Sequence, residues 1–148
     1  MTTVVIDLDG TLCNCVHRQH HAEQGQWDEF HSKLLDDPVY PDVAWFVAML
    51  PMDYEVIALT GRDIAFKDDT WAWLERNKLS LAIDHLMMRP KMDFTPDHIL
   101  KPQLLEGHIG SKEAVLAEVP IVLDDRDKVV EAWRNYGLPC WQVRPGGY

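Results

Sequence analysis

Short runs of β-branched and apolar residues recur along the chain, and each of them predicts a buried β-strand. The first run, residues 2–8, stops at the turn-forming pair Asp9-Gly10, which is typical of a strand covered on both faces. Four later runs have the same character and predict strands over residues 54–60, 85–88, 120–123 and 139–143. The chain therefore supplies about five strands for one sheet.

The segments between these strands carry apolar residues at the three- to four-residue spacing of a helix. Pro41 fits the first position of one helix, and Gly137 ends another. Thr95-Pro96-Asp97 is typical of a helix start, with Thr95 as the N-cap. Helices are therefore predicted over residues 27–35, 41–50, 64–79 and 127–136 and after Thr95, whereas the polar, aperiodic residues 13–26 predict a loop.

Strands that alternate with helices predict a parallel sheet covered on both faces, that is, an α/β three-layer sandwich. The 148 residues suit one domain, residues 1–148, because the sequence contains no linker, repeat or low-complexity segment. Val129, Val130 and Trp133 are expected in its core, as are Tyr136, Trp141 and Val143. The three cysteines are an odd number and no signal peptide is evident, so a reducing, cytoplasmic location is expected.

The net charge of the chain excludes some classes of function. The formal net charge of −10 excludes a broad basic face for nucleic acid, and no apolar run is long enough to cross a membrane. Any phosphate group must therefore be bound at a local site, with a metal ion or a few placed cations.

Reactive residues follow three of the predicted strands. These are Asp7 to Thr11 after the first strand, Thr60-Gly61-Arg62 after the second and Asp124-Asp125-Arg126 after the fourth. Ligands of such sheets bind at the carboxyl ends of the strands, so we expect these residues to meet there. Converging carboxylates repel one another unless a cation joins them, and oxygen ligands together with a substrate phosphate favour Mg²⁺.

Asp7-Leu8-Asp9-Gly10-Thr11 resembles the first motif of the haloacid dehalogenase (HAD) superfamily, whose phosphatases use an aspartate nucleophile. Leu59 to Arg62 resembles the second motif, and Val122 to Asp125 the fourth. The resemblance implies a Rossmann-like HAD sheet and hydrolysis of phosphomonoesters.

The family's roles carry over by position. The resemblance implies that Asp7 is the nucleophile, that Asp9 is the general acid and base, and that Thr60 and the Gly61 amide hold the phosphoryl oxygens. It also implies that Mg²⁺ is held by Asp7, the Asp9 carbonyl and Asp124 or Asp125. The third motif supplies a lysine, and we prefer Lys101 to Lys112 because an Asp97–Lys101 pair would direct it.

The C-terminal part, from Asp124 to Val143, is similar to the phosphatase domain of phage polynucleotide kinase/phosphatases. Asp97 and Lys101 resemble that domain's third-motif region, and Arg18 and Arg62 match positions where it places substrate-contacting arginines. Asp97 is a further candidate for substrate binding. No phosphate-binding loop of a kinase occurs in this sequence, so the resemblance covers the phosphatase half alone.

Residues 13–52 leave room only for a small helical cap, so the site is expected to be open to a nucleotide or a nucleic-acid end. Three functions follow: a 3′-phosphatase acting on nucleotides or polynucleotides, a 5′-nucleotidase acting on free mononucleotides, and a phosphate-binding module without turnover. Trp27 and Phe30 fit either the core of the cap or a platform for a base. A zinc site is the alternative for the loop residues Cys13, Cys15, His17, His20 and His21.

Overall fold

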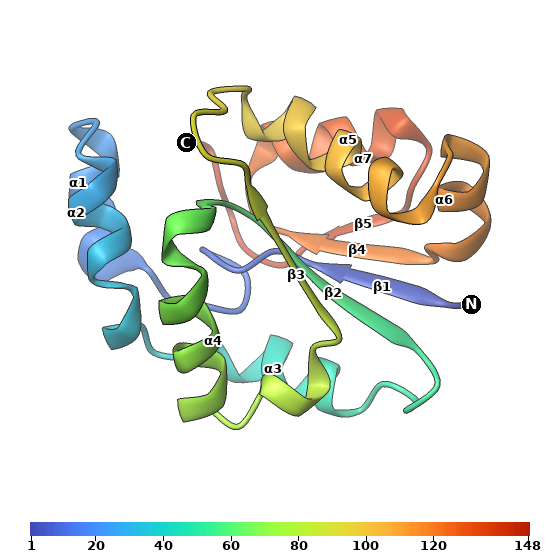
Figure 1. The fold of residues 1–148 in the computed structure, drawn as a ribbon, viewed down its shortest axis with the longest axis horizontal. Coiled ribbons are helices and arrows are strands. Elements are labelled where there is room, and N and C mark those ends of the chain that lie inside the picture. The colour runs from blue at the N-terminus through green and yellow to red at the C-terminus, as the bar shows by residue number, and fades with distance from the viewer.

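Five parallel strands form the central sheet of the computed structural model, which describes residues 1–148 (Figure 1). The strand order is β3-β2-β1-β4-β5, so β1 lies in the middle, where Val5 is paired with Ile57 on one side and with Val122 on the other. The predicted α/β sheet is confirmed. The strands are β1 (Thr3–Ile6), β2 (Glu55–Asp63), β3 (His85–Arg89), β4 (Ile121–Asp124) and β5 (Cys140–Gln142).

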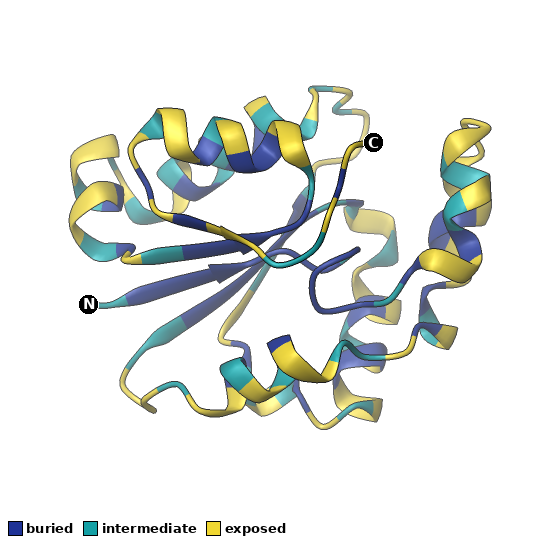
Figure 2. Cartoon of the chain, turned by 180° about the vertical axis from the view of Figure 1, so that it is seen from behind, coloured by how far each residue is buried: buried dark blue, intermediate teal, exposed yellow.

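Helices cover both faces of the sheet, because alternate strand residues point to opposite sides and are apolar on both. Ile6 belongs to one buried cluster and Val5 to the other. Figure 2 shows the strands buried and the outer faces of the helices exposed. On one face lie α3 (Pro41–Ala48) and α4 (Lys67–Arg76), and on the other lie α5 (Asp97–Ile109), α6 (Lys112–Glu118) and α7 (Asp127–Tyr136).

Two short helices, α1 (Gln19–Glu23) and α2 (Trp27–Ser32), stand beyond the carboxyl ends of the strands. The prediction of a loop over residues 13–26 was wrong in part, because this segment contains α1 and a 3₁₀ turn, Val16–Arg18. α1 has no buried residue, so it has no apolar stripe from which the sequence predicts a helix.

Several helices begin or end at other residues than their apolar periodicity predicts, because polar contacts of the backbone determine these ends. The helix predicted over 64–79 starts as a 3₁₀ turn capped by the Asp63 side chain and continues as α4. The helix predicted over 27–35 ends at Ser32 and is followed by a second 3₁₀ turn, Leu34–Asp36. Thr95 is not an N-cap: α5 begins at Asp97, and Thr95 lies in a turn where its amide donates to Asp93 and its carbonyl accepts from Arg89.

The prediction that Trp141 belongs to the core was also wrong. Its side chain is 57% exposed on the edge strand β5 and contacts Phe46 edge to face. An edge strand of three residues has little helix above it to cover an outward side chain. None of the helices combines the length and the apolar character needed to cross a bilayer.

Candidate active site

The carboxyl ends of β1 and β4 place three carboxylates around one lysine. Asp7 follows β1, Asp124 ends β4, and Asp125 is the next residue. Lys101, on α5, donates from Nζ to Asp7 Oδ1 at 2.8 Å and to Asp124 Oδ2 at 2.8 Å. All four side chains are buried, so this ion-pair cluster is the base of the site.

Asp125 is held from two sides. The Thr11 hydroxyl lies 3.1 Å from Asp7 Oδ2 and 3.4 Å from Asp125 Oδ1, and the Tyr148 hydroxyl donates to Asp125 Oδ2. Gly10 has a positive φ of 85°, and a Cβ at this position would overlap the Asp125 carboxylate. A glycine is therefore required for the first motif and the fourth to meet.

The charge of this cluster suits a divalent cation. One oxygen from each of Asp7, Asp124 and Asp125 lies within 4.8 Å of the others. Burial and the Asp124 carboxylate raise the pKa of Asp7 well above its ordinary value, although Lys101 opposes them. When all four groups are ionised, the three carboxylates and one lysine carry a net charge of −2, and the all-oxygen donor set is the one that hard cations prefer. The Asp9 carbonyl accepts no hydrogen bond from the protein, which leaves it free as a further ligand.

The Asp9 side chain turns away from this cluster and toward two buried arginines. Arg18 Nη2 lies 2.5 Å and Arg62 Nη2 lies 2.6 Å from Asp9 Oδ1. Burial by itself raises the pKa of Asp9, but the charges of Arg62 and Arg18 outweigh it and hold that pKa well below its usual range. Asp9 is therefore a carboxylate in the free protein at neutral pH.

The arginines lie deeper than the sequence interpretation expected. Arg18 is 0% and Arg62 is 1% exposed, whereas a side chain that binds a substrate group directly must be accessible from solvent. Asp37 anchors them, since Arg18 donates to its carboxylate at 2.6 and 2.8 Å and His17 Nε2 lies at 2.7 Å. Contact of Arg18 and Arg62 with a substrate stays a prediction.

The loop cysteines and histidines do not converge on a zinc site. The Cys13 thiol is buried and accepts from Arg62 at 3.5 Å, His17 faces Asp37, and His21 faces Gln26. Burial raises the pKa of the Cys15 thiol to about 12, which opposes the thiolate form that metals bind.

Thr60 and Gly61 lie on the other side of the cluster, within β2. The buried Thr60 hydroxyl accepts from the Arg62 amide at 3.2 Å, which leaves its own proton free to donate. A Cβ at Gly61 would overlap the Asp97 carboxylate, so this close approach also needs a glycine.

The predicted Asp97–Lys101 pair is not formed. Lys101 is directed by Asp7 and Asp124 instead, because their buried charges lie within reach of its Nζ. Asp97 binds Arg89 and, at 2.9 Å, Arg126. Lys112 starts α6 on the surface, as expected, where its ammonium lies 4.8 Å from the ring centre of Tyr136.

Trp27 and Phe30 were expected either in the core of the cap or as a platform for a base, and the structure places the two residues differently. Phe30 is buried and packs under the Arg18 guanidinium, 4.1 Å from its ring centre, so it belongs to the core of the cap. Trp27 is 56% exposed and meets Phe30 edge to face. Only Trp27 offers an open aromatic face.

Sequence reasoning missed several residues that shape the site. Asp37 stands between Asp36 and Pro38 and has no motif of its own, and Thr11 was noted only as part of the first motif. Arg89 reaches Asp97 from β3, and Tyr148 reaches Asp125 over 23 positions. Arg126, which also contacts Asp97, was predicted only as part of the run after the fourth strand. The positions of Thr11, four residues after Asp7, and of Arg126, next to Asp125, were the two signals in the sequence.

The family model for the polynucleotide kinase PNKP phosphatase domain matches residues 1–148. The chain belongs to this family of HAD-type phosphatase domains. The buried Asp7–Lys101–Asp124 cluster thus lies in a chain whose fold and motifs agree with the family.

Relatives of this PNKP-type domain are longer proteins. A protein of Autographa californica nuclear polyhedrosis virus, whose name describes it as a bifunctional polynucleotide kinase/RNA ligase, is 28% identical over 138 residues, 92% of this chain and 18% of its own. A chain in the structure of the Pnkp1/Rnl/Hen1 complex is 32% identical, with a TM-score of 0.82 over 99% of this chain and 47% of that one. This chain therefore spans less than half of these relatives.

The fold is shared more widely. A HAD-like hydrolase from Streptococcus pneumoniae, SP0104, superposes with a TM-score of 0.67 at 13% identity, over 95% of this chain and 83% of its own. The sheet and its covering helices are thus the common HAD-like architecture.

Proposed function

We propose that this PNKP-type domain is a Mg²⁺-dependent phosphomonoesterase that removes the 3′-phosphate from a nucleotide or polynucleotide end. The observation that carries the proposal is the Lys101 ammonium, which bridges Asp7 and Asp124 at 2.8 Å beside Asp125. This arrangement combines a nucleophile, a fixed positive charge and a divalent-cation site within one buried cluster.

In the first step, an Asp7 oxygen attacks phosphorus, the bond to the ester oxygen breaks, and the leaving oxygen takes a proton from Asp9. In the second step, Asp9 takes a proton from water, the water oxygen attacks phosphorus, and the bond to Asp7 breaks to release phosphate. Lys101 balances charge on Asp7 in both steps, and Thr60 and the Gly61 amide hold phosphoryl oxygens. Asp7, the Asp9 carbonyl and Asp124 or Asp125 would hold Mg²⁺, which would supply positive charge beside the transferred phosphoryl group.

The ionised state of Asp9 suits its part as a base in the second step. Its part as an acid requires that its contacts with Arg18 and Arg62 weaken when the substrate binds, because both arginines favour the carboxylate. An anionic substrate beside the arginines would compete for them in this way. The arginines then contribute to substrate binding through Asp9 even from their buried positions.

The choice of a nucleic-acid end is supported by the family and by what its relatives are named for. One similar chain, 32% identical with a TM-score of 0.82 over 99% of this chain and 43% of that one, belongs to a Pnkp1/Rnl/Hen1 complex described as an RNA repair complex. The cap consists of two short helices only, which supports a substrate as large as a chain end. We also propose a cytoplasmic location, which the odd number of cysteines supports.

A phosphate-release panel tests the proposal. It compares 3′-NMPs, 5′-NMPs, p-nitrophenyl phosphate and 3′-phosphorylated ribo- and deoxyribo-oligonucleotides, each with Mg²⁺ or with EDTA. We expect Mg²⁺-dependent release from the 3′-phosphorylated substrates and none from Asp7→Asn, which keeps the size of the side chain. Release from 5′-NMPs alone would make the domain a 5′-nucleotidase, and no release from any ester would make it a binding module.

A further inference from the structure

A second group of metal-ligating side chains lies at the opposite edge of the sheet from Asp7. Glu55 starts β2, His85 starts β3, and His108 lies in the last turn of α5. Because α5 runs antiparallel to the strands, its first turn reaches the catalytic edge and its last turn returns to the amino edge (Figure 1). Three separate elements therefore bring these residues together.

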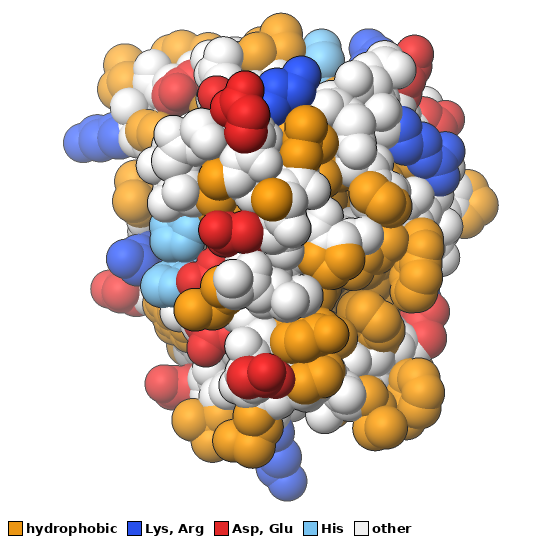
Figure 3. Space-filling model, turned by 90° about the vertical axis from the view of Figure 1, so that its right-hand side faces the viewer, with side chains coloured by type: hydrophobic (Ala, Val, Ile, Leu, Met, Phe, Trp, Pro, Cys, Tyr) orange, Lys and Arg blue, Asp and Glu red, His pale blue; other side chains and the backbone are white.

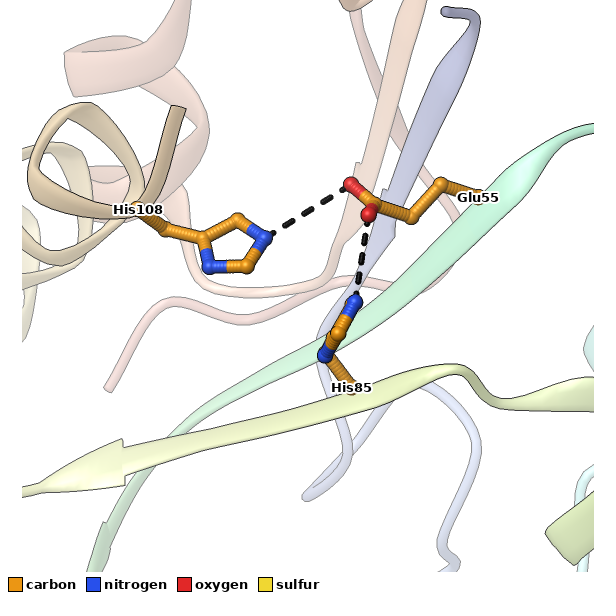
Figure 4. A group of neighbouring side chains, drawn as sticks. All are labelled: Glu55, His85 and His108. Atoms are coloured by element: carbon orange, nitrogen blue, oxygen red, sulfur yellow. Dashed lines mark ion pairs between the residues drawn. The ribbon is translucent and has the colours of Figure 1, made fainter. Parts of the chain in front are cut away.

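Strand register puts Glu55 and His85 on the face of the sheet that α5, with His108, covers. Glu55 alternates with Ile57 and Leu59, which face α5, and His85 is the partner of Ile57 in the parallel pairing of β2 with β3. Figure 4 shows His108 approaching one carboxylate oxygen of Glu55 and His85 approaching the other. Both imidazoles thus point at the same carboxylate through Nε2.

The distances approach those of a metal site. His85 Nε2 lies 3.1 Å from Glu55 Oε2, and His108 Nε2 lies 3.7 Å from Glu55 Oε1. Ligand atoms around a tetrahedral zinc ion, bound at roughly 2.0–2.2 Å, lie about 3.3–3.5 Å apart. One ligand atom from each of the three residues lies within 4.8 Å of the others, so small side-chain rotations suffice to close the site.

The surroundings favour a cation that arrives from solvent. The side chains of His85, His108 and Glu55 are 46%, 31% and 19% exposed. Glu55 lines two surface hollows of about 170 and 260 Å³, which also contain the carboxylates Glu118 in the first and Asp53 and Asp84 in the second. Figure 3 views this end of the molecule and shows neighbouring histidines with acidic side chains beside them.

The Thr3 hydroxyl donates to Glu55 Oε1 at 3.2 Å and so orients the carboxylate. A hydrogen bond to a ligating carboxylate is the usual outer support of a metal site.

We propose that Glu55, His85 and His108 bind a Zn²⁺ ion, separate from the Asp7 cluster. Two imidazoles and one carboxylate form a donor set typical of zinc, whereas Mg²⁺ prefers oxygen ligands alone. The two edges of the sheet thus select different metals by their donor atoms. Water completes the coordination from the hollows, and the ion links β2, β3 and α5.

The test titrates the full chain with Zn²⁺ against a chromophoric chelator, in the presence of excess Mg²⁺ to occupy the Asp7 cluster. We expect one Zn²⁺ per chain. His85→Ala and His108→Ala should each weaken binding more than about tenfold, because even the loss of an outer-shell partner costs about that much. His98→Ala removes a histidine on the first turn of α5 and should bind Zn²⁺ as the wild type does.

Co²⁺ gives a readout that does not depend on the alanine variants folding. The wild type should show the intense visible absorption of a tetrahedral site, and Glu55→Gln should reduce it. Absence of Zn²⁺ binding, or equal affinity in the wild type and both histidine variants, would leave Glu55 with ion pairs only and overturn the proposal. Loss of binding in Asp124→Asn or His17→Ala instead would also overturn it. None of these outcomes depends on phosphatase activity.

Discussion

At the residue scale, Asp9 is proposed to act as an acid and as a base, and its environment favours the ionised form that acts as a base. Arg18 and Arg62 hold it ionised, and yet the leaving oxygen needs a proton. Asp9→Asn cannot transfer a proton, so we expect a fall in kcat of about 10²–10⁴-fold on a 3′-NMP. The loss should be smaller on p-nitrophenyl phosphate, whose leaving group needs no proton when the phosphoenzyme forms. Steady-state rates on both substrates test this, and equal losses would contradict the acid role.

Asp37 lies beneath Asp9 and determines where Arg18 points. Its carboxylate is fully buried and accepts two hydrogen bonds from that guanidinium. Asp37→Asn removes the charge that balances a buried arginine, so we expect the free energy of unfolding to fall by about 3–5 kcal/mol. Denaturant unfolding followed by circular dichroism measures the change.

An exposed pair serves as the control for Asp37. Asp42 contacts Arg144 at 2.5 Å, but its side chain is 61% exposed. Asp42→Asn should therefore cost only about 0–1 kcal/mol, since water screens such a pair. If both substitutions cost the same small amount, the buried network does not hold the cap against the sheet.

At the element scale, the sequence predicted what periodicity and strand ends encode. All five strands were found because β-branched runs between turns have few other interpretations, and the carboxylates met because parallel strands end at one edge. The family resemblance supplied the expectation that a lysine meets Asp7, 94 positions from Lys101. The choice of Lys101 over Lys112 used the local spacing from Asp97, and that pair is not formed, because Lys101 is bound by Asp7 and Asp124.

The features that could not be predicted from the sequence depend on contacts between distant segments. α1 buries no residue and so leaves no periodic signal, and Asp37 gains its importance only when the chain folds Arg18 back onto it. Buried arginines are especially hard to anticipate, because an isolated arginine near a motif indicates a substrate contact equally well.

α2 contributes a pH-sensitive element to the cap. His31 is buried beside Phe30 and Phe66, and its Nδ1 has no hydrogen-bond partner. Burial, together with the charges of Arg62 and Arg18, lowers its pKa to about 4. Between this value and about 6.5 the unfolded chain binds the extra proton, so His31 reduces stability as the pH falls through that range, by at most about 1.4 kcal/mol per pH unit.

His31→Phe should therefore flatten the loss of stability between pH 6.5 and pH 4, because a phenyl ring fits the aromatic cluster and takes up no proton. Urea unfolding at several pH values measures the slope. His20→Phe, which changes an exposed histidine on α1, is the matched control and should keep the wild-type slope. An unchanged slope in His31→Phe would mean that other groups cause the acid sensitivity.

At the scale of the whole molecule, α5 connects two chemically different edges. Its 13 residues span about 20 Å, with Lys101 near one end and His108 near the other. The sheet therefore separates the oxygen-ligand cluster used for phosphoryl transfer from the imidazole-containing cluster. A substitution in one cluster therefore removes no direct contact of the other cluster.

The net charge of −10 determines how this domain meets a polyanion. Arg18 and Arg62 are already neutralised by Asp9 and Asp37, so at most one or two phosphates beyond the reacting group gain a cationic partner. Each such contact changes the logarithm of affinity for single strands by about −0.7 for each tenfold change in salt concentration.

For a 3′-phosphorylated dinucleotide we expect KM to rise with salt concentration, with a logarithmic slope of no more than about 1.4. A 20-mer should give a similar kcat/KM, because its further phosphates find no basic surface. The measurement is kcat/KM for both lengths across a salt series, with p-nitrophenyl phosphate as the reference for general effects of salt. A strong preference for the 20-mer with a steep slope would place a nucleic-acid-binding surface where the charge distribution of this chain offers none.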